Sequence, residues 1–170
     1  MTENSVESTV GGAVVTVRPL HATDTQLEAE FVRHLSADAR RLRFLGGVNT
    51  LSAAELKLLC DVDGLRSMAF VATTAQDGRE TAIGVSRYAP SSKDGASELA
   101  LTVADEWQLK GIAELLMERL IAYAKEHGVR QLYSVELAEN YAMKELARRL
   151  GMSAACNPDD TSQVIYSLAL

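Results

Sequence analysis

The chain has 170 residues, of which 47% are hydrophobic and 24% charged, and its formal net charge is −6 at pH 7. This composition is typical of a soluble globular protein, and the length fits a single domain. The negative charge argues against general nucleic-acid binding. The longest apolar runs, such as residues 68–72, are far too short to cross a bilayer. We therefore expect neither a nucleic acid nor a membrane as a partner.

The first twelve residues are polar, with neither the basic start nor the hydrophobic stretch of a signal peptide. We expect a disordered N-terminal tail over residues 1–12 and one domain over residues 13–170. Cys60 and Cys156 form neither a CxxC motif nor a disulfide framework, which favours buried free thiols in a reducing cytoplasm.

The first predicted elements are one strand and two helices. A β-branched run at residues 14–18 predicts a strand. Two capping-box patterns, Thr23 with Gln26 and Ser52 with Glu55, each precede apolar residues at helical spacing and so predict two helices.

Three strands follow. Apolar runs at residues 68–74 and 82–88 flank an Asp-Gly pair at 77–78, which is a strong hairpin signal. After a polar loop, residues 98–103 alternate between leucine or valine and other side chains. Because strand side chains alternate between faces, Glu98 lies on the face opposite the leucines.

The second half predicts a crossover. The elements are a long helix from about Gly111 to His127 that Gly128 ends, a strand at 131–137, a helix from Asn140 to Leu150 that Gly151 closes, and a last strand at 164–168. Mostly antiparallel strands precede a βαβ unit, so the fold class is mixed α/β rather than a doubly wound parallel sheet.

The turn before the long helix places Gly111 and Ala113 where the helix begins. The first N–H groups of a helix have no intrahelical partner and attract anions, and successive loop amides can add a concave nest. Two interpretations stay open: the small residues let a phosphate approach, or they allow close packing of helix on strand. The turn matches neither G-x-x-x-x-G-K-[ST] nor G-x-G-x-x-G.

The stretch Gln108-Leu109-Lys110-Gly111-Ile112-Ala113 resembles the Q/R-x-x-G-x-G/A pyrophosphate motif of the GNAT superfamily of N-acyltransferases. "ENYAMKELARRLGM", from Glu139 to Met152, is similar to a second helix of that family. "LSADARRLRFLGGVNTLSAAELKLLCDVDGLRSMAFVA" followed by "AIGVSRY" resembles the acetyltransferase domain of Pat-type bacterial protein lysine acetyltransferases.

The resemblance covers about residues 14–168 and implies a GNAT fold, with a central β-bulged strand and helices on both faces of the sheet. It leaves no room for a regulatory domain, so we expect activity that does not respond to cyclic nucleotides.

The resemblance also implies acetyl-CoA as co-substrate, lying in a splay between the fourth and fifth predicted strands. The pyrophosphate would lie on the amides of Gln108, Leu109, Lys110, Gly111, Ile112 and Ala113. Val103 would pair with the pantetheine arm, and Asn140 would either hydrogen-bond that arm or only cap its helix.

The resemblance implies direct attack by an amine within a ternary complex, and its Pat-type part implies the lysine of a protein as that amine. Glu98, in "SELAL", matches the Pat glutamate and is the candidate general base, unless it is only a solvated carboxylate at a strand edge. Glu136 and Glu139 are competing carboxylates without a family match. Cys60 and Cys156 lack an obvious histidine partner, which disfavours an acyl-cysteine route.

One departure concerns the proton for the leaving thiolate. Many family members carry a tyrosine in the second half of the last helix, where this chain has Ala147. Either another group supplies the proton or the thiolate leaves unaided, and we name no general acid.

The arginines, the histidines and the overall function remain to be considered. The arginines of residues 40–46 either line the acceptor entrance or form a solvated helix end. His21, His34 and His127 have no metal-ligand spacing, so we expect no metal. Competing functions are a non-catalytic acyl-CoA-binding module and a small-molecule amine N-acetyltransferase, and the oligomeric state stays open.

Overall fold

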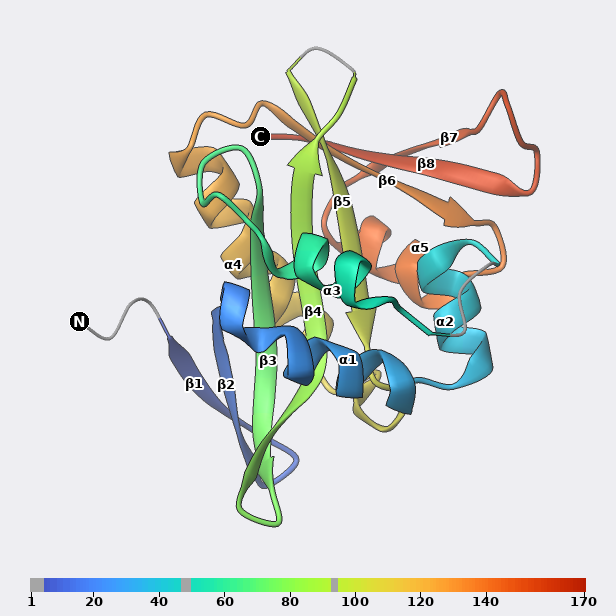
Figure 1. Ribbon diagram of the computed structural model, residues 1–170. Coiled ribbons are helices and arrows are strands. Elements are labelled where there is room, and N and C mark those ends of the chain that lie inside the picture. Colours follow the sequence, from blue (N-terminus) through green and yellow to red (C-terminus); the bar gives the residue numbers. More distant parts are fainter. Residues whose placement is uncertain (1–4, 47–49, 93–94) are drawn as a thin grey trace.

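The computed structural model describes residues 5–46, 50–92 and 95–170, and it contains one eight-stranded sheet with the order β1-β2-β3-β4-β5-β6-β8-β7 (Figure 1). Neighbouring strands are antiparallel except β5 and β6, which are parallel. The strands are β1 Val6–Val10, β2 Ala13–Pro19, β3 Met68–Gln76, β4 Arg79–Pro90, β5 Ala96–Val103, β6 Gln131–Leu137, β7 Ser153–Cys156 and β8 Gln163–Ala169.

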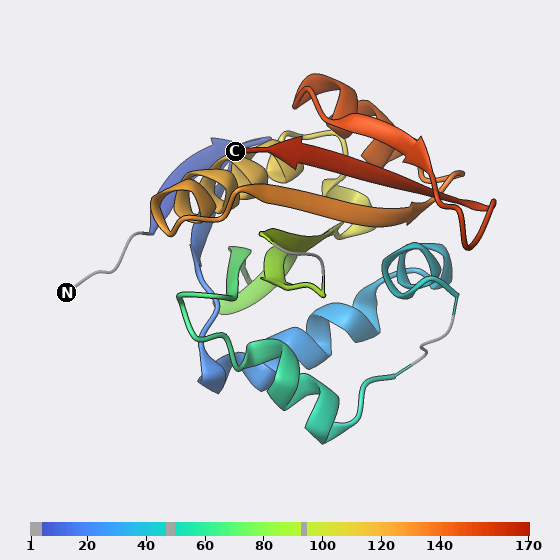
Figure 2. The ribbon, with the colours of Figure 1, turned by 90° about the horizontal axis from the view of Figure 1, so that it is seen from above.

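Helices cover both faces of this sheet, as the resemblance implies (Figure 2). One face carries α1 Thr25–His34, α2 Ala37–Phe44 and α3 Ala53–Cys60. The other carries α4 Ile112–Glu126 and α5 Tyr141–Arg149. Two 3-10 turns, η1 Ala22–Asp24 and η2 Asp105–Trp107, precede α1 and α4.

Two hydrophobic cores hold these layers together. Strand β3 contributes to both because its side chains alternate between faces. Met68, Phe70 and Ala72 join the core under α4 and α5, whereas Ala69 and Val71 join the core under α1 and α3. A strand that is buried on both faces consists mostly of apolar residues, without alternation, as residues 68–72 do.

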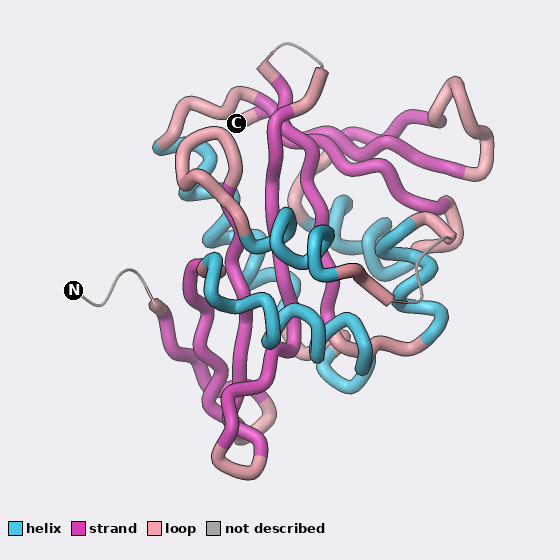
Figure 3. Tube along the Cα trace, in the orientation of Figure 1, coloured by secondary structure: helices cyan, strands magenta, loops and turns pink. Residues whose placement is uncertain are grey.

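The sheet splits in its middle. Strands β5 and β6 pair only from Ala96 with Gln131 to Glu98 with Tyr133. Beyond that point β6 turns away from β5 together with β8 and β7 (Figure 3). A bulge at Ile83 of the central strand β4 shifts its register with β3, so that Ala72 pairs with Gly84 and Thr73 with Ala82. The predicted bulged central strand is therefore confirmed.

Strand β1 corrects the expected disordered tail. Residues 6–10 pair with β2 through a two-residue turn at Gly11 and Gly12, whose φ angles are 57° and 84°. Positive φ at both turn positions is the geometry that favours Gly-Gly in a tight hairpin, so the signal was present in the sequence. Residues 1–4 lie outside the described residues, as do residues 93 and 94 of the predicted polar loop.

Two more elements were not predicted as separate units. Helix α2 begins at a cap, since Ser36 Oγ accepts from the backbone N–H of Ala39 at 3.0 Å. Its sequence is too rich in arginine for a clear apolar stripe. Strand β7 has four exposed residues and pairs only with β8, so no alternation marks it.

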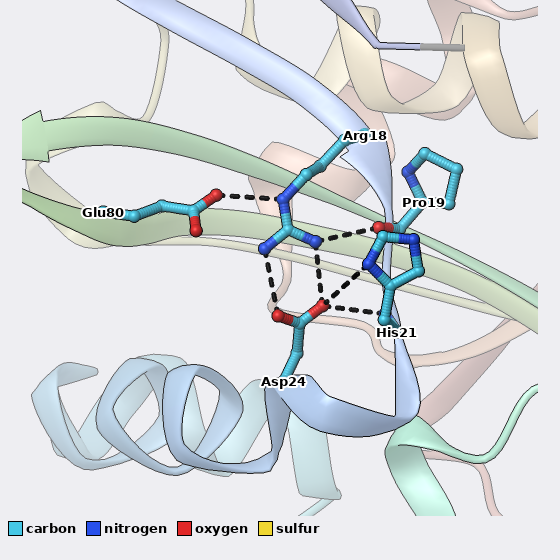
Figure 4. A network of polar contacts seen from close by, with 5 residues as sticks. All are labelled: Arg18, Pro19, His21, Asp24 and Glu80. Atoms are coloured by element: carbon cyan, nitrogen blue, oxygen red, sulfur yellow. Dashed lines mark hydrogen bonds and ion pairs between the residues drawn. The ribbon is translucent and has the colours of Figure 1, made fainter. Parts of the chain in front are cut away.

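One predicted cap is confirmed and one is wrong. Ser52 and Glu55 form the predicted capping box of α3. Thr23 is not the cap of α1, because η1 precedes that helix and Asp24 occupies the cap position. Asp24 accepts instead from the guanidinium of Arg18, at 2.8 and 3.0 Å, and from the backbone N–H of His21 at 2.7 Å (Figure 4). This pairing fixes the start of α1 to the end of β2.

The two cysteines differ in environment. Cys60 is buried, as expected, and burial raises the pKa of its thiol to about 11. Cys156 is exposed, which corrects the expectation of two buried thiols. Among the described residues, no helix is both long and apolar enough to span a membrane.

Candidate active site

A cavity of about 530 Å³ opens where β5 and β6 diverge. Its walls come from the two strands, the turn before α4 with the first turn of that helix, α5, and α2. Of the predicted site residues, seven line it: Glu98, Val103, Gln108, Leu109, Gly111, Ala113 and Asn140. The fold therefore brings together side chains that lie up to forty-two positions apart in the sequence.

Gly111 is the N-terminal cap of α4 and has a φ of 89°, a conformation that favours glycine. A Cβ built there would meet nothing within 4 Å. Close packing therefore does not explain this glycine, and that interpretation is wrong for Gly111. Gly84 on β4 has that role, because its Cβ would lie 2.9 Å from Leu116 Cδ1 of α4.

The backbone of the turn leaves amide groups available. The N–H of Leu115 is bonded to the carbonyl of Gly111 at 3.1 Å, closing the first turn of α4. The amides that precede Leu115 have no partner four residues earlier within the helix, as at every helix start. Leu109, with a φ of 60° and a side chain that is 96% exposed, also takes the left-handed conformation. The turn therefore offers backbone N–H groups without intrahelical partners at the start of α4, where Gly111 and Ala113 line the cavity.

The other side chains of the motif have structural roles. Gln108 Nε2 donates to the carbonyl of Val103 at 3.2 Å, which closes the turn onto the end of β5. Lys110 Nζ lies 5.2 Å from the ring centroid of Trp107, and Ile112 is buried in the core. The side chains of Lys110 and Ile112 do not line the cavity, so only their backbone amides are available to a ligand there.

Asn140 caps α5 and also joins the cavity wall. Its Oδ1 accepts from the N–H of Met143 at 3.1 Å, and its Nδ2 donates to Glu136 Oε2 at 3.1 Å. Thr102, on β5, lines the same cavity, and its hydroxyl is buried with no hydrogen-bond partner among the described residues. An unpaired buried hydroxyl fits a site that a polar ligand completes.

Glu98 lies where the split begins, since it belongs to the last residue pair of β5 and β6. Its side chain is exposed while the neighbouring Leu99 is 2% exposed, as the alternation in the sequence predicts. Glu98 thus presents an exposed carboxyl group to the cavity, on the face of the sheet opposite Leu99.

The two competing carboxylates differ. Glu136 lines the cavity and is 8% exposed. Burial raises its pKa above the ordinary range, although hydrogen bonds with Ser134 and Asn140 oppose the shift. Glu139 does not line the cavity; it forms an ion pair with Arg41 of α2 at 2.6 Å.

The arginines of residues 40–46 have different positions, so each of the two interpretations holds for one part of the stretch. Arg43 and Phe44 line the cavity, whereas Arg41 forms surface ion pairs with Asp38 and Glu139. Burial, reinforced by the nearby positive charge of Arg87, lowers the pKa of Arg43 to about 10. The sequence named this stretch but could not show which arginine faces inward.

Ala147 is 2% exposed and belongs to the core below α5. It supplies no hydroxyl to the cavity. Within residues 5–46, 50–92 and 95–170, no group of three or more His, Cys, Asp or Glu side chains is arranged to hold a metal ion.

Comparisons with known proteins agree with this geometry. The GNAT acetyltransferase domain model matches residues 15–153. An acetyltransferase of Pseudomonas aeruginosa is 44% identical over 165 residues, which cover 97% of this chain and 89% of that protein. Acetyltransferase Pat of Mycolicibacterium smegmatis is 29% identical over 136 residues, 79% of this chain and 40% of that protein. The crystal structure of the GNAT domain of S. lividans PAT superposes with a TM-score of 0.85 at 22% identity, covering 98% of this chain and 97% of that one. The chain belongs to the GNAT family of acetyltransferases.

Proposed function

We propose that the protein transfers an acetyl group from acetyl-CoA to a primary amine by direct attack in a ternary complex, with Glu98 as general base. The observation that carries this proposal is that one cavity joins the turn at Gly111 to Glu98. Glu98 and Val103 are five strand residues apart, about 16 Å at the usual rise of a strand. This span suits a pantetheine arm extended between a pyrophosphate on the turn and a thioester near Glu98.

The donor would bind through the residues that the sequence singled out. The amides of Gln108 to Ala113 would receive the pyrophosphate, because helix N-termini favour anions. The free edge of β5 that ends at Val103 would pair with the pantetheine arm as an added strand does. Asn140 Nδ2 keeps a second N–H beyond the one that it gives to Glu136, and this N–H is available to a pantetheine carbonyl.

The reaction needs an amine that has lost its proton, since an ammonium group has no lone pair. Glu98 would accept that proton, directly or through water, as the nitrogen attacks the thioester carbonyl. The C–N bond forms, the C–S bond breaks, and the product amide leaves with CoA. Neither cysteine supports an acyl-enzyme, because Cys60 is buried away from the cavity and Cys156 does not line it.

A protein lysine is the acceptor that we propose. The similarity to proteins named Pat supports this class. Glu98 also lines the cavity, and its negative charge would favour the approach of a cationic side chain. A small-molecule amine is the second candidate. A non-catalytic acyl-CoA-binding module is disfavoured, because Glu98 is kept at the end of the cavity that a thioester would reach. Since acetyl-CoA and lysine-bearing proteins share the cytoplasm, we propose that the protein acts there.

The test is release of CoA thiol from acetyl-CoA, measured with lysine-bearing proteins and with a panel of small amines. We expect release that depends on a lysine-bearing protein. Release with small amines only would favour the second candidate, and CoA binding without release would favour the non-catalytic module.

A further inference from the structure

Four glutamates line the cavity, and two of them, Glu114 and Glu145, form ion pairs with Arg149. The other two lie in opposite environments. Glu98 on β5 is exposed, whereas Glu136 on β6 is 8% exposed. The proposed transfer uses one carboxylate to remove a proton from the amine. A second carboxyl group on the same cavity, sheltered from water, is left without a role. Pairs of carboxyl groups whose environments differ in this way commonly divide into a base and an acid.

Glu136 is held rigidly on the wall of the split. Oε1 is hydrogen-bonded to Ser134 Oγ, and Oε2 accepts from Asn140 Nδ2 at 3.1 Å. Both partners line the cavity with it. Asn140 is itself fixed as the cap of α5. The carboxyl group therefore has a defined position between the strand and the start of the helix.

The charges around Glu136 come from several elements. Arg43 on α2 favours the carboxylate, and Glu98 on β5 disfavours it. On β8, Tyr166 lies opposite Ser134 in the register, and burial, followed by the charge of Glu136, raises the pKa of the Tyr166 hydroxyl. Burial is the largest influence on Glu136 and raises its pKa, so the neutral acid is favoured at a higher pH than for an ordinary glutamate.

We propose that Glu136 is the general acid that protonates the CoA thiolate as it leaves, an inference that rests on the proposed acetyl transfer. The helix position that could carry a hydroxyl for this purpose is Ala147, which is buried in the core. Glu136 instead approaches the split from the opposite strand, three residues beyond the last β5–β6 pair at Tyr133. This places it along the path of the pantetheine arm.

The protons balance over one turnover. The amine nitrogen attacks the thioester carbon and gives its proton to Glu98. As the C–S bond breaks, Glu136 gives its proton directly to sulfur, and CoA leaves as the thiol. Glu98 then holds an extra proton and Glu136 lacks one, and exchange with water in the open cavity restores both.

The decisive experiment compares two donors in single turnovers of Glu136→Gln. One donor is acetyl-CoA and the other is its selenoester analogue, in which selenium replaces the sulfur. A selenol is much more acidic than a thiol, so it leaves without a proton donor. We expect Glu136→Gln to lose about 10²-fold in rate with acetyl-CoA, the lower end for a positioned acid, and to recover most of that loss with the selenoester.

Two matched variants complete the design. Glu98→Gln should be slow with both donors, because its proton comes from the amine. Glu139→Gln changes a neighbouring carboxylate outside the cavity and should behave as the wild type. Far-UV circular dichroism and CoA affinity of Glu136→Gln establish that the variant is folded; its amide can accept from Asn140 and donate to Ser134.

A pH profile gives an independent readout. The wild-type rate should fall on the alkaline side as Glu136 loses its proton, and this fall should be absent in Glu136→Gln. Ser134→Ala removes a hydrogen bond that lowers the pKa of Glu136, so its alkaline fall should move to higher pH.

Several results would overturn the inference. Equal losses with both donors would make Glu136 a positioning residue, and an unchanged rate would mean that the thiolate leaves unaided. If Glu136→Gln does not fold, an unmoved alkaline limb in Ser134→Ala decides against the proposal. Failure of the wild type to release CoA with any amine would instead remove the proposed function itself.

Discussion

Ser36 and Asp105 join the start of α2 to the turn that follows β5. Ser36 Oγ donates to Asp105 Oδ1 at 2.8 Å, and the backbone N–H of Ser36 donates to Asp105 Oδ2 at 3.1 Å. Ser36 also caps α2 by accepting from Ala39. One carboxylate thus ties the helix that brings Arg43 to the cavity to the segment that leads into Gln108.

Loss of this tie should loosen α2 without unfolding the protein. In Asp105→Ala, we expect the KM for the amine acceptor to rise about two- to threefold, the worth of an exposed hydrogen bond. Asp105→Asn keeps one acceptor oxygen and should show a smaller effect. Steady-state kinetics at saturating acetyl-CoA measures the change, and a KM equal to that of the wild type would show that α2 holds its place without Asp105.

Glu98→Gln tests the proposed base. The substitution is nearly isosteric and far from the turn at Gly111, so the fold and CoA affinity should be kept. Turnover should fall by about 10²–10⁴-fold, the usual contribution of a positioned acid or base. The rate of the wild type should rise with pH, up to the alkaline fall assigned to Glu136, as the amine loses its proton. A loss smaller than about threefold at saturating acetyl-CoA would leave Glu98 as a surface carboxylate.

Gly111→Val tests the anion site. The β-branched side chain would enter the open space beside the turn amides and strain a backbone that has a φ of 89°. We expect CoA affinity to fall strongly in isothermal titration calorimetry. Gly151→Val is the matched control, because Gly151 has a φ of 70° and equally open surroundings but does not line the cavity. If both variants bind CoA as the wild type does, the turn is not the pyrophosphate site.

The Arg18–Asp24 pair makes stability depend on pH. Burial of Asp24 opposes its ionisation, but hydrogen bonds from Arg18 and from the N–H of His21 outweigh it, so the pKa of Asp24 lies below its ordinary value. A depressed pKa in the folded state stabilises the protein above the unfolded-state pKa of about 3.9, and this stabilisation is lost as pH falls through the folded-state value.

Asp24→Asn should therefore cost about 1–3 kcal/mol at neutral pH and progressively less below pH 4. Urea unfolding at pH 7, 4 and 3 measures the difference from the wild type. Glu80, whose side chain is half exposed, is the other carboxylate bonded to Arg18. Glu80→Gln should lower the free energy of unfolding by less than about 1 kcal/mol. An Asp24→Asn effect that is constant with pH would contradict the ionic contribution.

The sequence predicted the elements that have a strong period or a clear cap. Residues 68–74 and the helix beginning after Gly111 lie where the apolar pattern placed them. Helix α2 and strand β7 were missed because their residues are mostly exposed or charged, so burial leaves little pattern in them. Strand β1 was missed although Gly11 and Gly12 mark its turn. At the start of α1, the ionic partner of Asp24 lies on β2, a contact that local capping rules do not include.

The parts of the site that depend on local chain geometry could be predicted from the sequence. The parts that depend on the divergence of β6 from β5 could not. The turn from Gln108 to Ala113 could be named from its own residues. The burial of Glu136 and the inward direction of Arg43 could not, because each depends on how far β6 diverges from β5. That divergence is a tertiary property with no period in the sequence.

The short pairing of β5 with β6 has a consequence for cooperativity. Strands β1 to β5 and strands β6, β8 and β7 are joined across the sheet only from Ala96 to Glu98, so the split is a seam of low local stability. Without ligand, amides that point into the seam should exchange with deuterium faster than those of β4, which is paired on both sides. A ligand that bridges the seam adds its binding free energy to the unfolding free energy of both halves, about 2.7 kcal/mol at a concentration one hundred times its Kd. Occupancy of the site would thus add a second connection across the seam to the hydrophobic core that both halves already share.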